Sequence, residues 1–82
     1  MIIYDDINQK ELMHAILLLT PKEARELLGA LEQLTTKPGD HYHLNNEAYS
    51  KEITIALYTP DNRKSFAKIF QEMIEDELLA AA

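Results

Sequence analysis

The chain of 82 residues contains no cysteine, no tryptophan, only two glycines and only three prolines. The absence of cysteine excludes disulfide bonds, thiolate zinc sites and thiol chemistry, and it favours the reducing cytoplasm as the location of the protein. With 46% hydrophobic and 27% charged residues, the composition is typical of a globular protein rather than of a disordered one. We therefore expect residues 1–82 to form a single small domain with a thin core.

Long hydrophobic runs and large clusters of positive charge are also missing. No uninterrupted apolar run is longer than the five residues 15–19, whereas a membrane-spanning helix needs about 20 apolar residues. Eight Lys and Arg residues against fourteen Asp and Glu residues give a net charge of −6, and the basic residues cluster locally only at Arg63, Lys64 and Lys68. Nucleic-acid binding depends on clustered basic side chains. We expect neither a membrane nor a nucleic acid as a partner.

A short motif occurs twice in the chain. Residues 17–21 read Leu-Leu-Leu-Thr-Pro, and residues 56–60 read Ala-Leu-Tyr-Thr-Pro. A threonine can cap a helix with its hydroxyl group, and a proline suits the first helical position because it has no N–H to leave unpaired. Each motif therefore predicts a strand, a cap and a helix.

The two helices predicted after these motifs are amphipathic. The first spans residues 21–34 and opens with a capping box formed by Thr20 and Glu23. Its expected buried stripe consists of Ala24, Leu27, Leu28, Leu31 and Leu34. The second spans about residues 61–79, and its expected buried stripe consists of Phe66, Ile69, Phe70, Met73, Ile74 and Leu78.

The strands are predicted from alternation and from turn residues. Residues 51–59 alternate between apolar and mostly smaller or polar side chains, which is typical of a half-buried strand. Residues 40–44 form a shorter strand, and the turn at residues 45–48 joins the two into an antiparallel hairpin. Residues 13–19 are either a buried strand or part of a helix capped by Asp6. The parallel with the second Thr-Pro motif favours the strand.

These elements predict an α+β fold. The expected order is β-α-β-β-α, in one small two-layer domain with a three-stranded sheet and two amphipathic helices.

Parts of the chain resemble a group of small bacterial proteins of unassigned function. The likeness lies in residues 19–27 (Leu-Thr-Pro-Lys-Glu-Ala-Arg-Glu-Leu), residues 39–44 (Gly-Asp-His-Tyr-His-Leu) and residues 49–54 (Tyr-Ser-Lys-Glu-Ile-Thr). It covers about residues 18–59. The resemblance implies a bacterial origin, and small acidic proteins of this style include immunity proteins that neutralise toxins. It transfers no catalytic residue to this chain.

Two histidines on the predicted hairpin form the pair of residues best suited to begin a metal site. His41 and His43 project to the same face of a strand because residues i and i+2 share a face. Glu52 or Asp40 could add a third ligand, and a metal-binding or metal-sensing protein is the alternative function that this pair suggests. However, catalytic zinc needs three protein ligands and structural zinc needs four. We favour exposed strand residues over a metal site, and we expect no bound cofactor.

The sequence contains no convincing catalytic motif. Ser50 with His41 or His43 could form a hydrolase-like set, but spacing alone does not place a nucleophile beside a base. Neither a nucleophile elbow nor a glycine-rich phosphate loop is present. We therefore expect no enzymatic activity and identify no small-molecule substrate.

Two features favour self-association. Residues 13–19 are apolar on both faces of the predicted strand, so that one face needs a cover. In the second predicted helix basic residues precede acidic ones, which opposes the helix dipole, and an antiparallel copy would pair the opposite charges; a solvated face is the alternative. The expected interface residues are Met13, Ala15, Leu17, Lys64, Lys68, Glu72 and Glu75. We expect a non-enzymatic interaction module, an adaptor or an immunity-type inhibitor, that forms a homodimer or binds another protein.

Overall fold

The computed structural model describes residues 1–81, and over these residues it shows two α-helices and two two-stranded sheets. The protein is thus a small α+β protein, as predicted. Its contacts divide it into two compact units, which are residues 19–62 and residues 1–18 together with 63–81. In the described part of the chain, no helix is long and apolar enough to cross a membrane.

The helix of the unit of residues 19–62 is α1, Pro21–Thr36. The predicted capping box is confirmed: the Glu23 N–H donates to Thr20 Oγ1 (3.1 Å), and the Thr20 N–H donates to Glu23 Oε1 (2.9 Å). These bonds pair backbone and side-chain groups that a helix start otherwise leaves unpaired. The helix therefore begins at the residue predicted and ends two residues later than predicted.

The stripe that α1 buries is narrower than the sequence predicted. Leu34 is fully buried, with 0% of its surface exposed, and Leu27 and Ala30 are half-buried. Leu28 and Leu31 were expected in the same stripe, but 58% and 40% of their surfaces are exposed. The buried line follows residues 23, 27, 30 and 34, which are spaced alternately by four and three residues, and it leaves Leu28 and Leu31 to one side.

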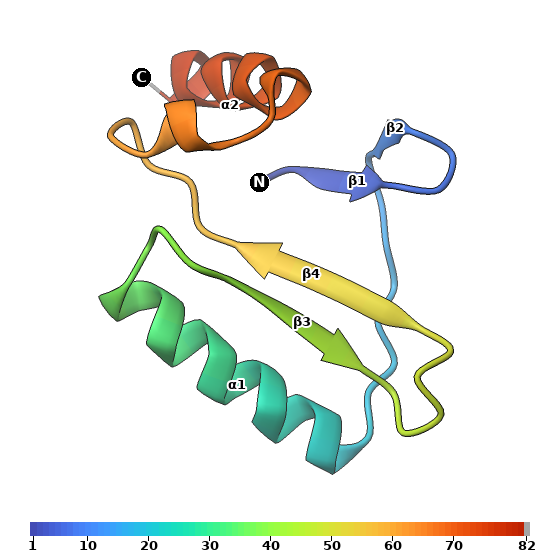
Figure 1. Ribbon diagram of the computed structural model, residues 1–82. Helices are drawn as coiled ribbons and strands as arrows, with labels where there is room; N and C mark the ends of the chain where they lie inside the picture. Colours follow the sequence, from blue (N-terminus) through green and yellow to red (C-terminus); the bar gives the residue numbers. More distant parts are fainter. Residues whose placement is uncertain (82) are drawn as a thin grey trace. The chain divides into compact units, whose positions relative to one another are not determined.

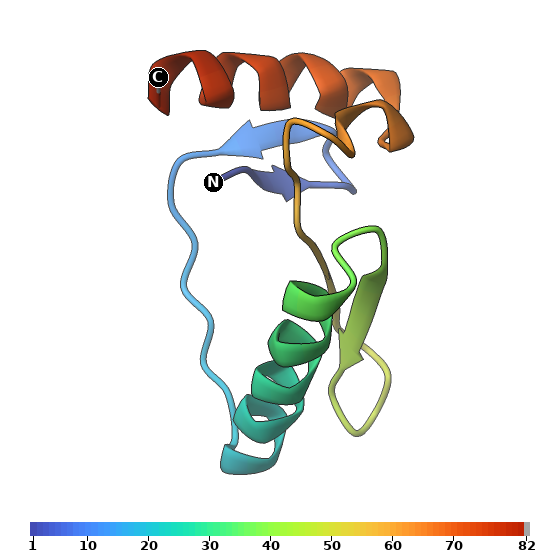
Figure 2. The ribbon, with the colours of Figure 1, turned by 90° about the vertical axis from the view of Figure 1, so that its left-hand side faces the viewer.

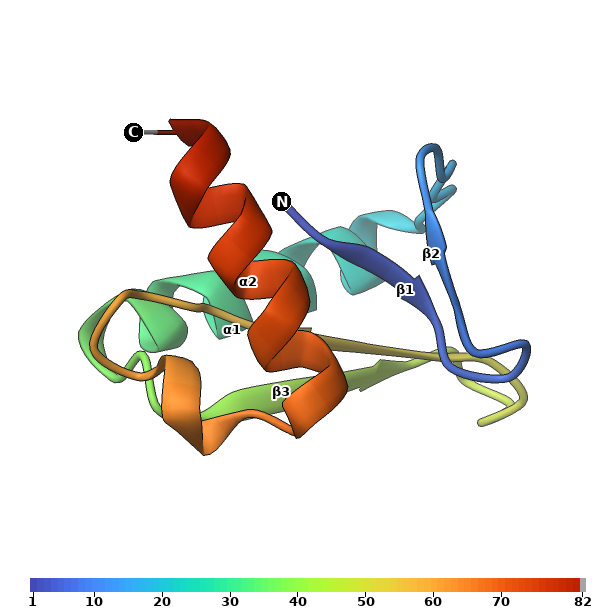
Figure 3. The same cartoon turned by 90° about the horizontal axis from the view of Figure 1, so that it is seen from above.

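The predicted hairpin is confirmed as β3, His41–Asn45, paired antiparallel with β4, Glu52–Ala56. Helix α1 lies along one side of it, against β3 (Figures 1 and 3). The apolar side chains of the hairpin are half-buried and share one face, and they are Tyr42, Leu44, Ile53 and Ile55. The Tyr42 hydroxyl donates to Gln33 Oε1 of α1, which ties the helix to the hairpin on that face.

The turn of this hairpin is organised by Asn46. Its Oδ1 accepts from the backbone N–H groups of Ser50 (2.9 Å) and Lys51 (3.0 Å), and its Nδ2 donates to Ser50 Oγ (3.0 Å). Tyr49 has a positive φ of 53° in this turn, a conformation that costs a residue with a Cβ some free energy. The Asn46 bonds offset that cost and fix the register of the strands.

The other unit contains a hairpin that the sequence analysis did not predict. Strand β1, Ile3–Asp5, pairs antiparallel with β2, Lys10–Leu12. The Asp5 carboxylate holds the turn, because Oδ1 accepts from the N–H groups of Ile7 (3.0 Å) and Asn8 (3.1 Å) and Oδ2 accepts from Asn8 Nδ2 (2.7 Å). These bonds are those of a local Asx turn.

Helix α2, Lys68–Ala81, lies along the β1–β2 hairpin in this unit (Figure 2). Ile74 is 1% exposed, and the rings of Tyr4 and Phe70 meet edge to face with centroids 5.0 Å apart. Of the expected stripe, Ile69 is exposed and the other members are buried or half-buried.

The start of the second helix is a correction to the sequence prediction. We expected it at residue 61, but α2 begins at Lys68 after a short 3₁₀ helix, η1, Arg63–Ser65. Thr59 Oγ1 does accept from the Asn62 N–H (3.1 Å), the bond expected of a cap, but the residues that follow form a turn and not the predicted helix. The Asn62 side chain, however, bonds back to Thr59 N (2.8 Å) and to Pro38 O (3.1 Å). These bonds hold a tight turn where the sequence predicted a continuous helix.

The predicted strand at residues 13–19 is wrong, and with it the three-stranded sheet and the order β-α-β-β-α. The observed order is β1-β2-α1-β3-β4-α2, and each sheet has two strands over residues 1–81. Residues 14–19 have no helix or strand structure and appear in Figures 1 and 2 as a thin trace between β2 and α1. The physical reason is that a strand exists only where its backbone groups have a partner, and these residues have none in the described chain.

Candidate interaction surface

The apolar segment, which we define as residues 13–19, carries large hydrophobic side chains in contact with solvent. Met13 and Leu18 are each 90% exposed, and more than half of the surface of Ile16 and of Leu17 is exposed as well. Single exposed hydrophobic residues are ordinary, but a contiguous apolar stretch is typical of an interaction site. Three of the predicted interface residues, Met13, Ala15 and Leu17, lie here and are exposed.

The backbone of the apolar segment is unpaired as well. Among the described residues, no backbone hydrogen bond involves residues 14–19. Six consecutive residues thus present free peptide groups, and all of them except His14 carry apolar side chains. This combination suits a segment that pairs with a strand of another chain.

The β3–β4 hairpin offers free peptide groups of its own. The Asn46 N–H donates to Lys51 O (3.3 Å), so these residues form a hydrogen-bonded pair next to the pair Asn45 and Glu52. Hydrogen-bonded and non-hydrogen-bonded pairs alternate along an antiparallel ladder. Ile53 and Ile55 therefore exchange bonds with β3.

The same alternation identifies the groups on the outer edge of β4. Glu52, Thr54 and Ala56 belong to the non-hydrogen-bonded pairs, so their N–H and C=O groups point away from β3. No third strand covers this edge in the structure of residues 1–81. The edge of β4 is thus a row of unpaired donors and acceptors.

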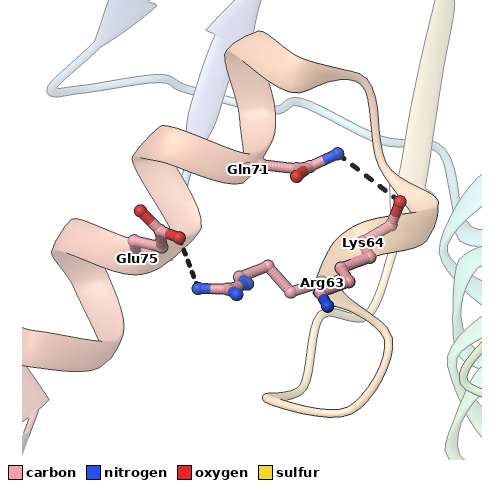
Figure 4. Close-up of polar contacts among 4 residues, drawn as sticks. All are labelled: Arg63, Lys64, Gln71 and Glu75. Carbon is pink, nitrogen blue, oxygen red and sulfur yellow. Dashed lines mark hydrogen bonds and ion pairs between the residues drawn. The ribbon is translucent and has the colours of Figure 1, made fainter.

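One of the predicted charged interface residues, Glu75, has a partner within its own chain. Arg63 Nη1 and Glu75 Oε1 form an ion pair within the chain (Figure 4). Gln71 Nε2 donates to the carbonyl oxygen of Lys64 (3.4 Å), which ties η1 to α2 (Figure 4). It also donates to the carbonyl oxygen of Phe66 (2.7 Å). Arg63 Nε is buried without a hydrogen-bond partner. Part of the charge pattern that suggested an antiparallel helix pair is therefore satisfied within one chain.

The remaining predicted charged residues are exposed. Lys64 lies in η1, and Lys68 and Glu72 lie four residues apart on α2, where side chains share a face of the helix. An exposed pair of this kind contributes only about 0.3–0.5 kcal/mol. Their place in an interface stays a prediction.

His41, His43 and Glu52 lie on the face of the hairpin opposite to α1. The rings of His41 and His43 are 5.0 Å apart and nearly perpendicular. His43 Nδ1 lies 2.8 Å from Thr54 Oγ1 and 3.7 Å from Glu52 Oε1. In residues 1–81 no three His, Asp or Glu side chains are grouped so that they could hold a metal ion. The histidines thus contact Thr54 and each other, and metal binding by them stays a prediction.

The sequence analysis missed the free edge of β4. Alternation predicted the strand itself, but it does not reveal how many neighbours a strand has. The signal that could have found the edge is the hairpin turn, because Asn46 fixes the register from which the outward groups follow.

A hollow lies between α1 and the hairpin, next to Gly29 and Ala30 of the helix and Tyr42 and Ile55 of the strands. It is open to solvent, and its volume is about 190 Å³. Small-molecule sites are typically clefts of about 300–1,000 Å³, so we base no functional argument on it.

Comparison of the chain with protein-family models, with curated proteins and with solved structures gave no match.

Proposed function

We propose that the protein is a non-enzymatic interaction module, an adaptor or an immunity-type inhibitor, that acts as a homodimer. The observation that supports this proposal is the exposure of the apolar segment. Met13, Ile16 and Leu18 each leave at least 74% of their surface in solvent. Burial of such a side chain contributes about 1.5–3 kcal/mol.

The charge of the chain opposes self-association in general, but the chemistry of the apolar segment favours it at that site. The net charge of −6 makes two copies repel each other at long range. The apolar segment, however, contains no Asp, Glu, Lys or Arg. An interface centred on it therefore avoids the like charges.

The test is a comparison of two variants with equally exposed sites. Leu18→Asp places a charge in the apolar segment, and Ile7→Asp places one in the turn between β1 and β2, where Ile7 is 92% exposed. We expect the first variant to be monomeric and the second to remain dimeric, because only the first charge would be desolvated in the interface. Size-exclusion chromatography with light scattering measures both masses. Dimers of equal strength for the two variants would contradict the proposal.

A further inference from the structure

We infer that the apolar segment of one chain adds as a third strand to the free edge of β4 in a second copy. This inference rests on the proposed homodimer and specifies its contacts. A two-stranded hairpin is marginally stable by itself and is stabilised by further strands or by a packed helix. Helix α1 packs against β3, so β4 is the strand of this hairpin that lacks a neighbour on its outer side among the described residues. The chain lacks a third strand in either sheet over residues 1–81, and it carries one unpaired stretch that could supply it.

The acceptor is defined by the outward peptide groups of β4. Those of Glu52, Thr54 and Ala56 recur at every second residue, which is the spacing that an added strand requires. Strand β4 reads Glu-Ile-Thr-Ile-Ala: it contains neither proline nor lysine, and its one charged residue, Glu52, stands at its first position. Natural edge strands are commonly protected by such residues. The edge of β4 is therefore open to pairing.

The other strand edges are less suitable. Helix α1 packs against β3, so the helix covers the sheet near that edge. Strands β1 and β2 have only three residues each, and they include the charged residues Asp5, Lys10 and Glu11. Short strands and charged side chains both discourage the addition of a strand. These features favour β4.

The apolar segment has the length and composition of the missing strand. Its seven residues span roughly 23 Å when extended, against roughly 17 Å for the five residues of β4, at about 3.3 Å per residue. It contains no glycine and no proline. Pro21 follows Thr20 and begins α1, so the pairing must end there because proline has no N–H to donate.

The partner that pairs with β4 is a second copy of the chain, because each chain carries both the apolar segment and the free edge of β4. The segment of the first chain on β4 of the second, and the reverse, make two identical contacts related by a two-fold axis. If each large side chain buries on the order of 100 Å² of apolar surface, the exposed side chains of the apolar segment contribute roughly 300–400 Å² per copy. With the surfaces that they cover on the partner, both contacts reach the roughly 1,200–2,000 Å² that stable interfaces bury.

The side chains of the added strand would also cover apolar surface that the hairpin and α1 leave exposed. Ile53 and Ile55 are only half-buried on the face toward α1, and Leu28 and Leu31 of α1 are exposed. Alternate residues of an added strand point to this face and extend the apolar layer beneath the helix. The remaining residues lie beside Thr54 and Ala56 on the other face.

The test is amide hydrogen exchange followed by NMR, with the oligomeric state measured on the same samples. In the dimer, the amides of Thr54 and Ala56 should exchange at least ten-fold more slowly than in the monomeric Leu18→Asp variant. The amides of Ile53 and Ile55 bond to β3 and serve as the internal control, which should stay protected in both. A mixture of labelled and unlabelled chains should show contacts between the apolar segment and β4 of different copies.

The outcomes separate the inference from the proposed function. A dimer in which the Thr54 and Ala56 amides exchange at the rate of the variant would overturn strand addition and leave the homodimer standing. A monomer with unprotected amides at these positions would overturn both. A monomer in which these two amides are protected would mean that the segment pairs within its own chain, and it would also overturn both.

Discussion

Among single residues, Asn62 connects the turn after β4 to the loop after α1. Its Oδ1 accepts from Thr59 N (2.8 Å), and its Nδ2 donates to Leu57 O (2.9 Å) and Pro38 O (3.1 Å). These groups are partly buried, and a buried polar group that loses its partner costs about 1–3 kcal/mol. The side chain therefore stabilises the unit of residues 19–62 through several groups at once.

We predict that Asn62→Ala lowers the free energy of unfolding by about 2–4 kcal/mol, since two carbonyl groups and one N–H lose their partners. Asn45→Ala is the matched control, because the Asn45 side chain makes no hydrogen bond that is found in the described residues. The control should change stability by less than about 0.5 kcal/mol. Urea unfolding measures both, and equal losses in the two variants would disprove this role of Asn62.

Asp5 gives the β1–β2 turn a dependence on pH. The side-chain and backbone hydrogen bonds from Asn8, followed by the one from Ile7, hold the pKa of the Asp5 carboxyl below its ordinary value. The carboxyl is therefore more acidic in the folded than in the unfolded chain. Its contribution to stability is complete above the ordinary carboxyl pKa and is lost as the pH falls through the lowered pKa.

The variant Asp5→Asn tests this dependence. We predict that it is less stable than the parent protein at neutral pH and that the difference shrinks as the pH falls through the lowered pKa of Asp5, because the protonated acid resembles the amide. Unfolding free energies at a series of pH values measure the difference. A difference that stays constant with pH would show that the charge of Asp5 contributes nothing.

Among the helices and strands, α1 is attached to its unit mainly through the side chains on its buried face. Leu34 is 0% exposed and Leu31 is 40% exposed, although both belong to the stripe that the sequence predicted. Truncation of a buried leucine to alanine lowers the free energy of unfolding by about 2–5 kcal/mol. Truncation of a partly exposed leucine lowers it less, because less buried surface and fewer packing contacts are removed.

We therefore predict that Leu34→Ala lowers the free energy of unfolding by about 2–5 kcal/mol. Leu31→Ala, the control on the same helix, should lose less than half as much. Both are measured in the Leu18→Asp background, so that a loss of dimer contacts does not contribute. A larger loss for Leu31→Ala would mean that the helix presents its other side to the hairpin.

The elements that the sequence predicted are those with strong local signals. The capping box of Thr20 and Glu23 defined the start of α1, and alternation with turn residues defined the β3–β4 hairpin. The second Thr-Pro motif carried the same signal, and Thr59 and Asn62 form the same reciprocal bonds as Thr20 and Glu23. However, Asn62 Nδ2 also donates to Leu57 O and Pro38 O, and a turn follows instead of a continuous helix. The β1–β2 hairpin was missed because strands of three residues are too short to show alternation.

The candidate surface was predicted only in part. The two-sided apolar character of residues 13–19 was evident in the sequence, and the side chains are indeed exposed. The strand was not found because strand formation depends on a partner and not on propensity alone. The charges of the second helix were read as free, whereas Arg63 and Glu75 meet within the chain, a long-range contact that spacing along one helix does not reveal.

At the scale of the whole molecule, burial of apolar surface and strand pairing hold the two chains of the proposed dimer together. Exposed ion pairs each contribute only about 0–1 kcal/mol and are screened beyond a Debye length of about 10 Å at 0.1 M salt. Apolar surface contributes about 25 cal/mol per Å² and is not weakened by salt in this way. A dimer held by the apolar segment should therefore persist when salt is raised, whereas a dimer held by the charges of α2 should dissociate.

Sedimentation equilibrium of the unmodified protein at tens of micromolar, in low and in high salt, tests this central claim most directly. We predict a mass twice that of the 9.4 kDa chain under both conditions. A dimer that dissociates in high salt would contradict the apolar basis of the interface, and a monomer under both conditions would contradict the homodimer itself.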